Sequence, residues 1–286
     1  MPNLTLPRTL LASMLLSALS ISSLSAAEID NSSLESADFR PHVATYGLVY
    51  RLPEAVNATL SNKVTPRVEQ TLRELKLSRE LDTINIPHIT VVHIHSADPT
   101  TPEKMLAALP KPPAPLMITL KTFSKTEAAK DAGRPWWLDL GVVKQGQGFE
   151  QMMSYNTAAT AAALAPLRDG PLPRVTGPVY AKMSDAGKAL VKQVGVSGVN
   201  VIKDGQPLLA HNPHNTFVYS MTPLTAELNA GLDTLVASLN QAQPTGIETT
   251  LNDVSIVQLA FAGNVIRELY RISLIDGKVS DLRNKQ

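Results

Sequence analysis

Two short stretches of the chain carry a histidine and a threonine at the same spacing. His88 and Thr90 lie in the stretch Pro-His-Ile-Thr-Val, and His214 and Thr216 lie in Pro-His-Asn-Thr-Phe, 126 positions further on. Both stretches fall in β-prone runs, where alternate residues point to the same face about 7 Å apart. Each copy therefore predicts one imidazole and one hydroxyl side by side on a sheet. The repetition favours a shared function over two unrelated structural histidines.

Two imidazoles in one pocket would suit acid–base phosphoryl chemistry. The unperturbed pKa of histidine, about 6.5, allows one ring to accept a proton from the attacking water or hydroxyl while the other donates to the leaving oxygen. The two threonine hydroxyls would donate hydrogen bonds to the non-bridging phosphate oxygens. We therefore predict His88 and His214 as catalytic residues and Thr90 and Thr216 as phosphate-binding residues. This chemistry needs no metal and no cofactor.

His93 and His95, with Asp98 nearby, suggest a different site. They resemble a fragment of a metal-hydrolase signature, but on a regular strand they would point to the face opposite His88 and Thr90. No companion ligands occur at helical spacing elsewhere in the sequence. We interpret them as structural or surface residues. A metal-dependent hydrolase centred on them remains an alternative, as does a protein that binds a phosphorylated ligand without turnover.

The hydrophobic pattern predicts the elements that position the two motifs. Strands are expected at 46–52, 84–94, 116–123, 136–143, 199–203, 206–210, 214–220, 253–261 and 265–275, and helices at 60–75, 101–110, 146–165, 184–194 and 222–239. Pro66 should kink or start its helix, and residues 125–134 should be a polar connector. Trp136 and Trp137 adjoin in a strand, so one should face the core and the other outward, where it could stack on a base. The second half echoes the first, which predicts an α+β fold with two antiparallel sheets, each carrying one motif.

The two motifs resemble the paired His-x-Thr-hydrophobic signatures of the two-histidine (2H) phosphoesterase superfamily, which includes RNA 2′,3′-cyclic phosphodiesterases. The resemblance extends over about residues 45–275, because the strand that ends at Leu52-Pro53, its helix, two central strands and the closing hairpin follow the family's order. It implies a bilobal, pseudo-symmetric fold with a central cleft lined by the two sheets and helices outside. It also implies metal-independent hydrolysis of small nucleotide or oligonucleotide phosphodiesters, most of all 2′,3′-cyclic phosphates.

The N-terminus predicts export. Arg8 precedes an apolar run from Leu10 to Leu24, and small residues follow at Ser25-Ala26-Ala27, which is typical of a cleaved secretory signal over residues 1–27. The run has about 15 residues, fewer than the 20 or so that a spanning helix needs. We expect a periplasmic protein with a polar leader at 28–45. A single bilobal domain should occupy 46–286, with an insertion around 169–203 that includes a linker rich in proline.

Composition limits the partners. The chain has no cysteine, so disulfides, thiolate ligands and cysteine nucleophiles are excluded. Removing residues 1–27 takes away Arg8 and no acidic residue, so the 26 basic residues become 25, equal to the 25 acidic ones. A balanced charge argues against an extended nucleic-acid surface, although a local basic pocket is compatible with it. The expected partner is a small nucleotide or a short RNA end, with no membrane span after signal removal.

Overall fold

The structure is a computed structural model that describes residues 44–77, 87–96, 98–127, 136–160, 201–203, 206–208, 212–220, 222–259 and 263–284. The predicted signal, the helix expected at 184–194 and nearly all of the predicted insertion lie outside these residues. Among the described helices, none is long and apolar enough to cross a membrane.

The first sheet has five antiparallel strands in the order β11-β10-β9-β1-β2. Its strands are β1 (Ala44–Arg51), β2 (His88–Ser96), β9 (Asp253–Leu259), β10 (Val265–Ser273) and β11 (Val279–Asp281). Strand β1 pairs along its whole length with β2 and begins at Ala44, two residues before the strand start predicted from the sequence. Strand β11 was not predicted.

The second sheet has four antiparallel strands in the order β7-β4-β3-β8, and a separate hairpin joins β5 to β6. The strands are β7 (His214–Ser220), β4 (Trp136–Val142), β3 (Leu116–Glu127), β8 (Ile247–Leu251), β5 (Val201–Lys203) and β6 (Gln206–Leu208). Strand β3 continues to Glu127, so the connector predicted to begin at Lys125 was wrong at its start. The polar residues Ser124 and Thr126 stay in the strand because their hydroxyls donate to the Asp139 carboxylate on β4.

Both sheets mix strands from the two halves of the sequence. Strands β1 and β2 pair with the C-terminal strands β9 to β11, and strands β3 and β4 pair with β7 and β8. The predicted fold class, α+β with two antiparallel sheets that carry one motif each, is confirmed. Although the order of elements in the second half resembles that in the first, each half does not form a sheet of its own.

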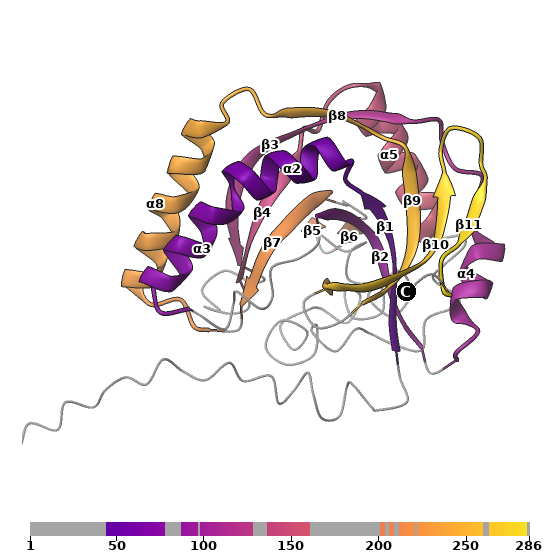
Figure 1. The fold of residues 1–286 in the computed structure, drawn as a ribbon, viewed down its shortest axis with the longest axis horizontal. Helices are drawn as coiled ribbons and strands as arrows, with labels where there is room; N and C mark the ends of the chain where they lie inside the picture. Colours follow the sequence, from indigo (N-terminus) through magenta and orange to yellow (C-terminus); the bar gives the residue numbers. More distant parts are fainter. Residues whose placement is uncertain are drawn as a thin grey trace, which may run out of the picture.

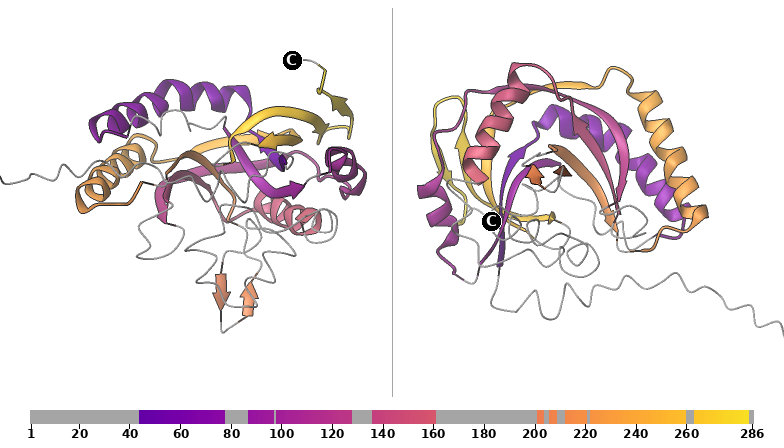
Figure 2. Two further views of the ribbon diagram at one scale, coloured as in Figure 1. Left: turned by 90° about the horizontal axis from the view of Figure 1, so that it is seen from below. Right: turned by 180° about the vertical axis from the view of Figure 1, so that it is seen from behind.

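The helices lie around the periphery of the sheets, and α3 and α8 run side by side (Figures 1 and 2). The helices are α2 (Glu54–Lys63), α3 (Thr65–Glu74), α4 (Thr101–Ala108), α5 (Gln147–Thr157) and α8 (Ala226–Ala242). Pro66 lies in the first turn of α3, so the predicted helix is divided at Val64, as expected for proline at a helix start. Helix α8 begins after Thr225, whose hydroxyl accepts a hydrogen bond from the Leu228 N–H.

The first sheet buries apolar residues on both faces. One face belongs to the main core, which includes Leu48, Tyr50 and Ile256 and extends to the helices and the second sheet. The other face carries a small buried cluster of Val49, Val257, Leu259 and Val265. Strand register places this second cluster on the face that also carries His88 and Thr90, because Val49 lies opposite Thr90. This face is called the motif face below.

Candidate active site

The two predicted motifs meet where the two sheets adjoin. Strands β2 and β7 are the edge strands of their sheets and lie next to each other. The backbone N–H of His88 donates a hydrogen bond of 2.9 Å to Oδ1 of Asn215, the central residue of the second motif. Both residues are buried. The chain therefore brings together two stretches that are far apart in the sequence, as predicted.

The proline before each histidine accepts a backbone hydrogen bond where its motif strand begins. The carbonyl oxygen of Pro213 accepts a 3.0 Å hydrogen bond from the Val142 N–H, and that of Pro87 accepts one of 3.4 Å from the Leu52 N–H. In both cases the donor stands at the end of the neighbouring strand. The two motifs thus enter their sheets in the same way.

The orientation of His214 leaves one ring nitrogen for chemistry. Its Nδ1 lies 2.6 Å from the carbonyl oxygen of Asn212. A carbonyl can only accept, so Nδ1 must carry the proton and donate it. In the neutral ring Nε2 then holds the lone pair that can accept a proton. The ring is half-buried, whereas His88 is only 4% exposed.

Strand register places each threonine beside its histidine. His88 lies opposite Arg51 and Thr90 opposite Val49 on the same face of β1. In the second sheet His214 lies opposite Gly141 and Thr216 opposite Asp139. Both threonines are half-buried. The geometry predicted from a spacing of two residues therefore exists in both sheets.

A β-bulge changes the position of His93. Thr90 pairs with Val49 and Val92 with Leu48, so Val91 is an extra residue and the alternation shifts after it. His93 consequently lies opposite Gly47, on the motif face rather than on the opposite face. The prediction for His93 was wrong because it assumed a regular strand. In the described part of the chain, no group of three or more His, Asp or Glu residues is placed to hold a metal ion.

The face of the second sheet that carries His214 and Thr216 also carries a pair of stacked aromatic rings. Trp137 and Tyr219 are register partners, and their rings lie nearly parallel, with centroids 6.0 Å apart and an interplanar angle of 9°. Trp136 points the other way, is fully buried, and donates from Nε1 to the carbonyl oxygen of Thr222 at 2.7 Å. The prediction that one tryptophan faces the core and the other does not is confirmed. Sequence reasoning missed Tyr219 as the partner of Trp137.

Asp139 is a second feature of this face that sequence reasoning missed. Its carboxylate is buried and accepts hydrogen bonds from Ser124 Oγ at 2.5 Å and from Thr126 Oγ1 at 2.9 Å. Trp137, Asp139 and Gly141 alternate along β4, so Asp139 lies between the aromatic pair and His214. The site is therefore bounded on one side by aromatic rings and a fixed acceptor group.

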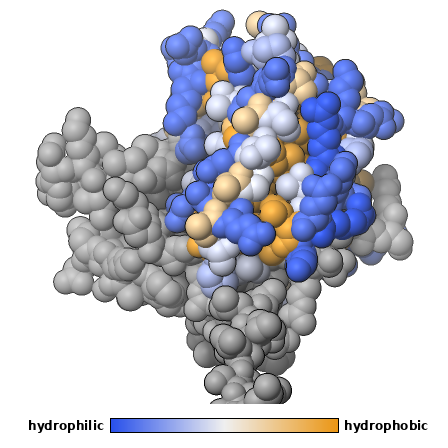
Figure 3. Space-filling view, turned by 90° about the vertical axis from the view of Figure 1, so that its left-hand side faces the viewer, coloured by the Kyte–Doolittle hydropathy of each residue, from blue (hydrophilic) through white to orange (hydrophobic). Residues whose placement is uncertain are grey.

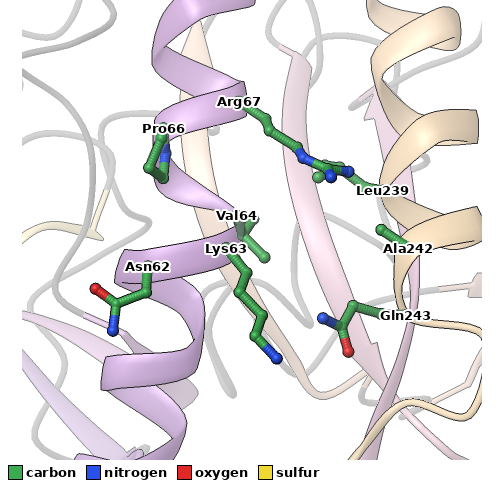
Figure 4. Close-up of a pocket in the computed structure, with 8 residues that line it drawn as sticks. All are labelled: Asn62, Lys63, Val64, Pro66, Arg67, Leu239, Ala242 and Gln243. Atoms are coloured by element: carbon green, nitrogen blue, oxygen red, sulfur yellow. The ribbon is translucent and has the colours of Figure 1, made fainter.

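A groove on the outside of the molecule is separate from this site. It has a volume of about 380 Å³ and is lined by residues of α2, α3 and α8 and the junctions beside them: Asn62, Lys63, Val64, Pro66, Arg67, Leu239, Ala242 and Gln243 (Figure 4). Hydrophilic residues flank apolar ones on the side of the molecule where α3 and α8 lie (Figure 3). None of the four predicted site residues lines the groove.

Comparison with known proteins gives similarity at the level of solved structures only. No protein-family model matches the chain, and no curated protein matches it. The crystal structure of TT0787 of Thermus thermophilus is similar with a TM-score of 0.41 and 15% sequence identity, over 81% of this chain and 98% of that one. The structure of Kluyveromyces marxianus Usb1 gives a TM-score of 0.35 and 11% identity, over 74% of this chain and 93% of that one.

The architecture itself agrees with the resemblance found in the sequence. The resemblance to the two-histidine superfamily implies an α+β fold with two antiparallel sheets, and the chain has them.

Proposed function

We propose that this protein is a metal-independent phosphodiesterase of the two-histidine kind. Its substrates are small nucleotide or oligonucleotide phosphodiesters, with 2′,3′-cyclic phosphates foremost. The observation that carries the proposal is the convergence of the two motifs, joined by the 2.9 Å hydrogen bond from the His88 N–H to Asn215 Oδ1. Two histidines from adjoining edge strands can then act on one phosphorus atom.

The reaction follows from the two proton states of imidazole. The unprotonated histidine accepts a proton from water as the water oxygen forms a bond to phosphorus. The other histidine, protonated, donates to the ribose oxygen as the bond from that oxygen to phosphorus breaks. The product is a phosphomonoester, and exchange of protons with solvent restores both rings. Thr90 and Thr216 donate hydrogen bonds to the non-bridging oxygens, where negative charge builds up.

The stacked pair of Trp137 and Tyr219 supports a nucleotide as the substrate. A nucleobase can stack on an aromatic ring with a contribution of about 1 to 3 kcal/mol per base, whichever base it is. Asp139, on the same face, holds a carboxylate that could accept from an exocyclic amino group. These groups lie beside His214 and Thr216, so a base bound there would leave the phosphate near both motifs.

The first experiment is a substrate panel assayed with purified protein in excess chelator. We expect hydrolysis of nucleoside 2′,3′-cyclic phosphates at a rate that the chelator does not change, and slower hydrolysis of 3′,5′-cyclic and linear diesters. Loss of activity in chelator, together with full activity of His88→Ala, would instead identify a metal-dependent hydrolase. Nucleotide binding without turnover of any substrate would identify a binding protein.

A further inference from the structure

A charged network lies on the motif face of the first sheet, and the reaction above does not use it. Its centre is Glu268 on β10, which is only 9% exposed. One carboxylate oxygen accepts from Ser255 Oγ at 2.6 Å and from Arg271 Nε at 2.8 Å. The other accepts from Arg51 Nη1 at 3.0 Å and from Arg271 Nη2 at 2.5 Å. The carboxylate is therefore fully engaged, and it holds two arginines in place.

Register shows that this network shares the face of His88. Arg51 is the direct cross-strand partner of His88, and Ser255 is the partner of both Val49 and Arg271. Paired residues of an antiparallel sheet point to the same face, with their Cβ atoms about 4.5 to 5.5 Å apart. The Arg51 side chain therefore starts beside the predicted catalytic histidine.

Arg51 retains hydrogen-bonding capacity that the described residues do not use. Its side chain is 28% exposed, and within the described residues only Nη1 makes an ion pair. Its Nε is buried and has no hydrogen-bond partner. A guanidinium has five N–H donors in a planar fork that matches phosphate oxygens.

Two guanidinium groups share the single carboxylate of Glu268. The carboxyl group of Asp253 also interacts electrostatically with both arginines. The network is therefore a compact group of charged side chains on the face that carries His88.

The guanidinium group of Arg51 lies away from the expected position of the reacting phosphate. Arg51 reaches from β1 across β9 toward Glu268 on β10, which is the direction away from β7. Neighbouring strands are about 4.8 Å apart, so the group lies roughly 10 Å from the line of β2. The reacting phosphate must lie between β2 and β7 to meet both histidines. Arg51 can thus meet a different anionic group of the same substrate.

We propose that Arg51, positioned by Glu268, forms a second phosphate subsite beside the two-histidine site. The inference rests on the proposed function and narrows its substrate class to nucleotides that carry a phosphate in addition to the one that reacts. An RNA end that closes in a 2′,3′-cyclic phosphate is such a substrate, because its terminal nucleotide also bears a 5′-linked phosphate.

The test compares two ligands that differ by one phosphate group. Adenosine 3′-monophosphate and adenosine 3′,5′-bisphosphate are titrated into the full chain by calorimetry. We expect the wild type to prefer the bisphosphate by about tenfold, the effect of one charge-assisted phosphate contact. Arg51→Met should abolish the preference, and Arg51→Lys should retain part of it. Thermal unfolding of each variant verifies that it is folded.

Arg267→Met is the matched control. Arg267 is on the same strand as Glu268, but its Nε donates to Gln258, which lies opposite Tyr46 on the other face of the sheet. This variant should keep the full preference. Equal affinity of the wild type for both ligands, or a preference that survives Arg51→Met, would overturn the proposal.

Turnover of adenosine 2′,3′-cyclic phosphate, measured in parallel, tests the proposed function independently of the phosphate subsite. Turnover without a bisphosphate preference contradicts the subsite and leaves the proposed function standing. A bisphosphate preference that depends on Arg51, without any turnover, supports the subsite and contradicts the proposed function.

Discussion

At the scale of single residues, the sequence indicated the motif residues but not the groups that surround them. His88 with Thr90 and His214 with Thr216 were recognisable because a spacing of two residues puts both side chains on one face of any strand. Arg51 and Glu268 had no such signal. They form an ion pair although they are 217 positions apart in the sequence, and only the order of strands in the sheet brings them together.

Glu268 provides a prediction at this scale. Burial acts to raise its pKa, but hydrogen bonds from Arg271 and Ser255 and the charge of Arg51 outweigh it, so the pKa lies below the ordinary value of 4.5. A lowered pKa in the folded state means that the carboxylate stabilises the fold above about pH 4.5, and that this contribution is lost as the pH falls through the folded-state pKa. Glu268→Gln should therefore lower the free energy of unfolding at neutral pH by about 1.5 to 3 kcal/mol.

Urea unfolding of both proteins at several pH values measures this effect. The difference between wild type and Glu268→Gln should shrink as the pH drops below about 4.5, because the wild-type carboxylate then becomes protonated. Arg267→Met, on the opposite face of the same strand, should show a pH-independent and smaller change. A constant difference between Glu268→Gln and wild type down to low pH would show that the charge of Glu268 does not stabilise the fold.

At the scale of elements, patterns of hydrophobic residues predicted most strands but not their irregularities. The bulge at Val91 depends on how β2 pairs with β1, so the local alternation that placed His93 on the wrong face could not reveal it. Strand β8 was missed because only Ile247 and Leu251 of its five residues are apolar. The division between helices α2 and α3 was predictable, because Pro66 has no backbone N–H and is tolerated in the first turn of a helix but not in its interior.

Asn215 joins the two motif strands and gives a prediction at this scale. Asn215→Ala removes the acceptor for the buried His88 N–H, which should lower the free energy of unfolding by about 1 to 3 kcal/mol. It should also lower kcat more than it raises KM, because His88 loses the contact that aligns it with the second motif. Chemical unfolding and steady-state kinetics with a 2′,3′-cyclic nucleotide measure the two effects.

Asn62→Ala serves as the control for this variant, because Asn62 is an exposed residue of helix α2 and lies in the outer groove. Its stability and kinetics should stay close to those of the wild type. If Asn215→Ala unfolds more easily but turns over substrate at the wild-type rate, Asn215 holds the sheets together without positioning His88.

At the scale of the whole molecule, the exchange of strands between halves is what creates the site. Residues His88 and His214 belong to different sheets, and each sheet needs strands from both ends of the chain before its motif strand is supported. The sequence predicted two sheets with one motif each, because the motifs and the order of elements repeat. It could not predict which strands pair, since this is decided by packing between segments more than 200 residues apart, as between β1 and β9.

The central claim is that two histidines from distant parts of the chain act on one phosphorus atom. The most direct test is the turnover of a nucleoside 2′,3′-cyclic phosphate, in chelator, by wild type, His88→Ala, His214→Ala and the double variant. Each single change should lower kcat by about 10²-fold or more, and the double change should lower it by far less than the product of the two, because both rings serve one transition state. Wild-type turnover by either single variant, or losses that multiply in the double variant, would contradict the claim.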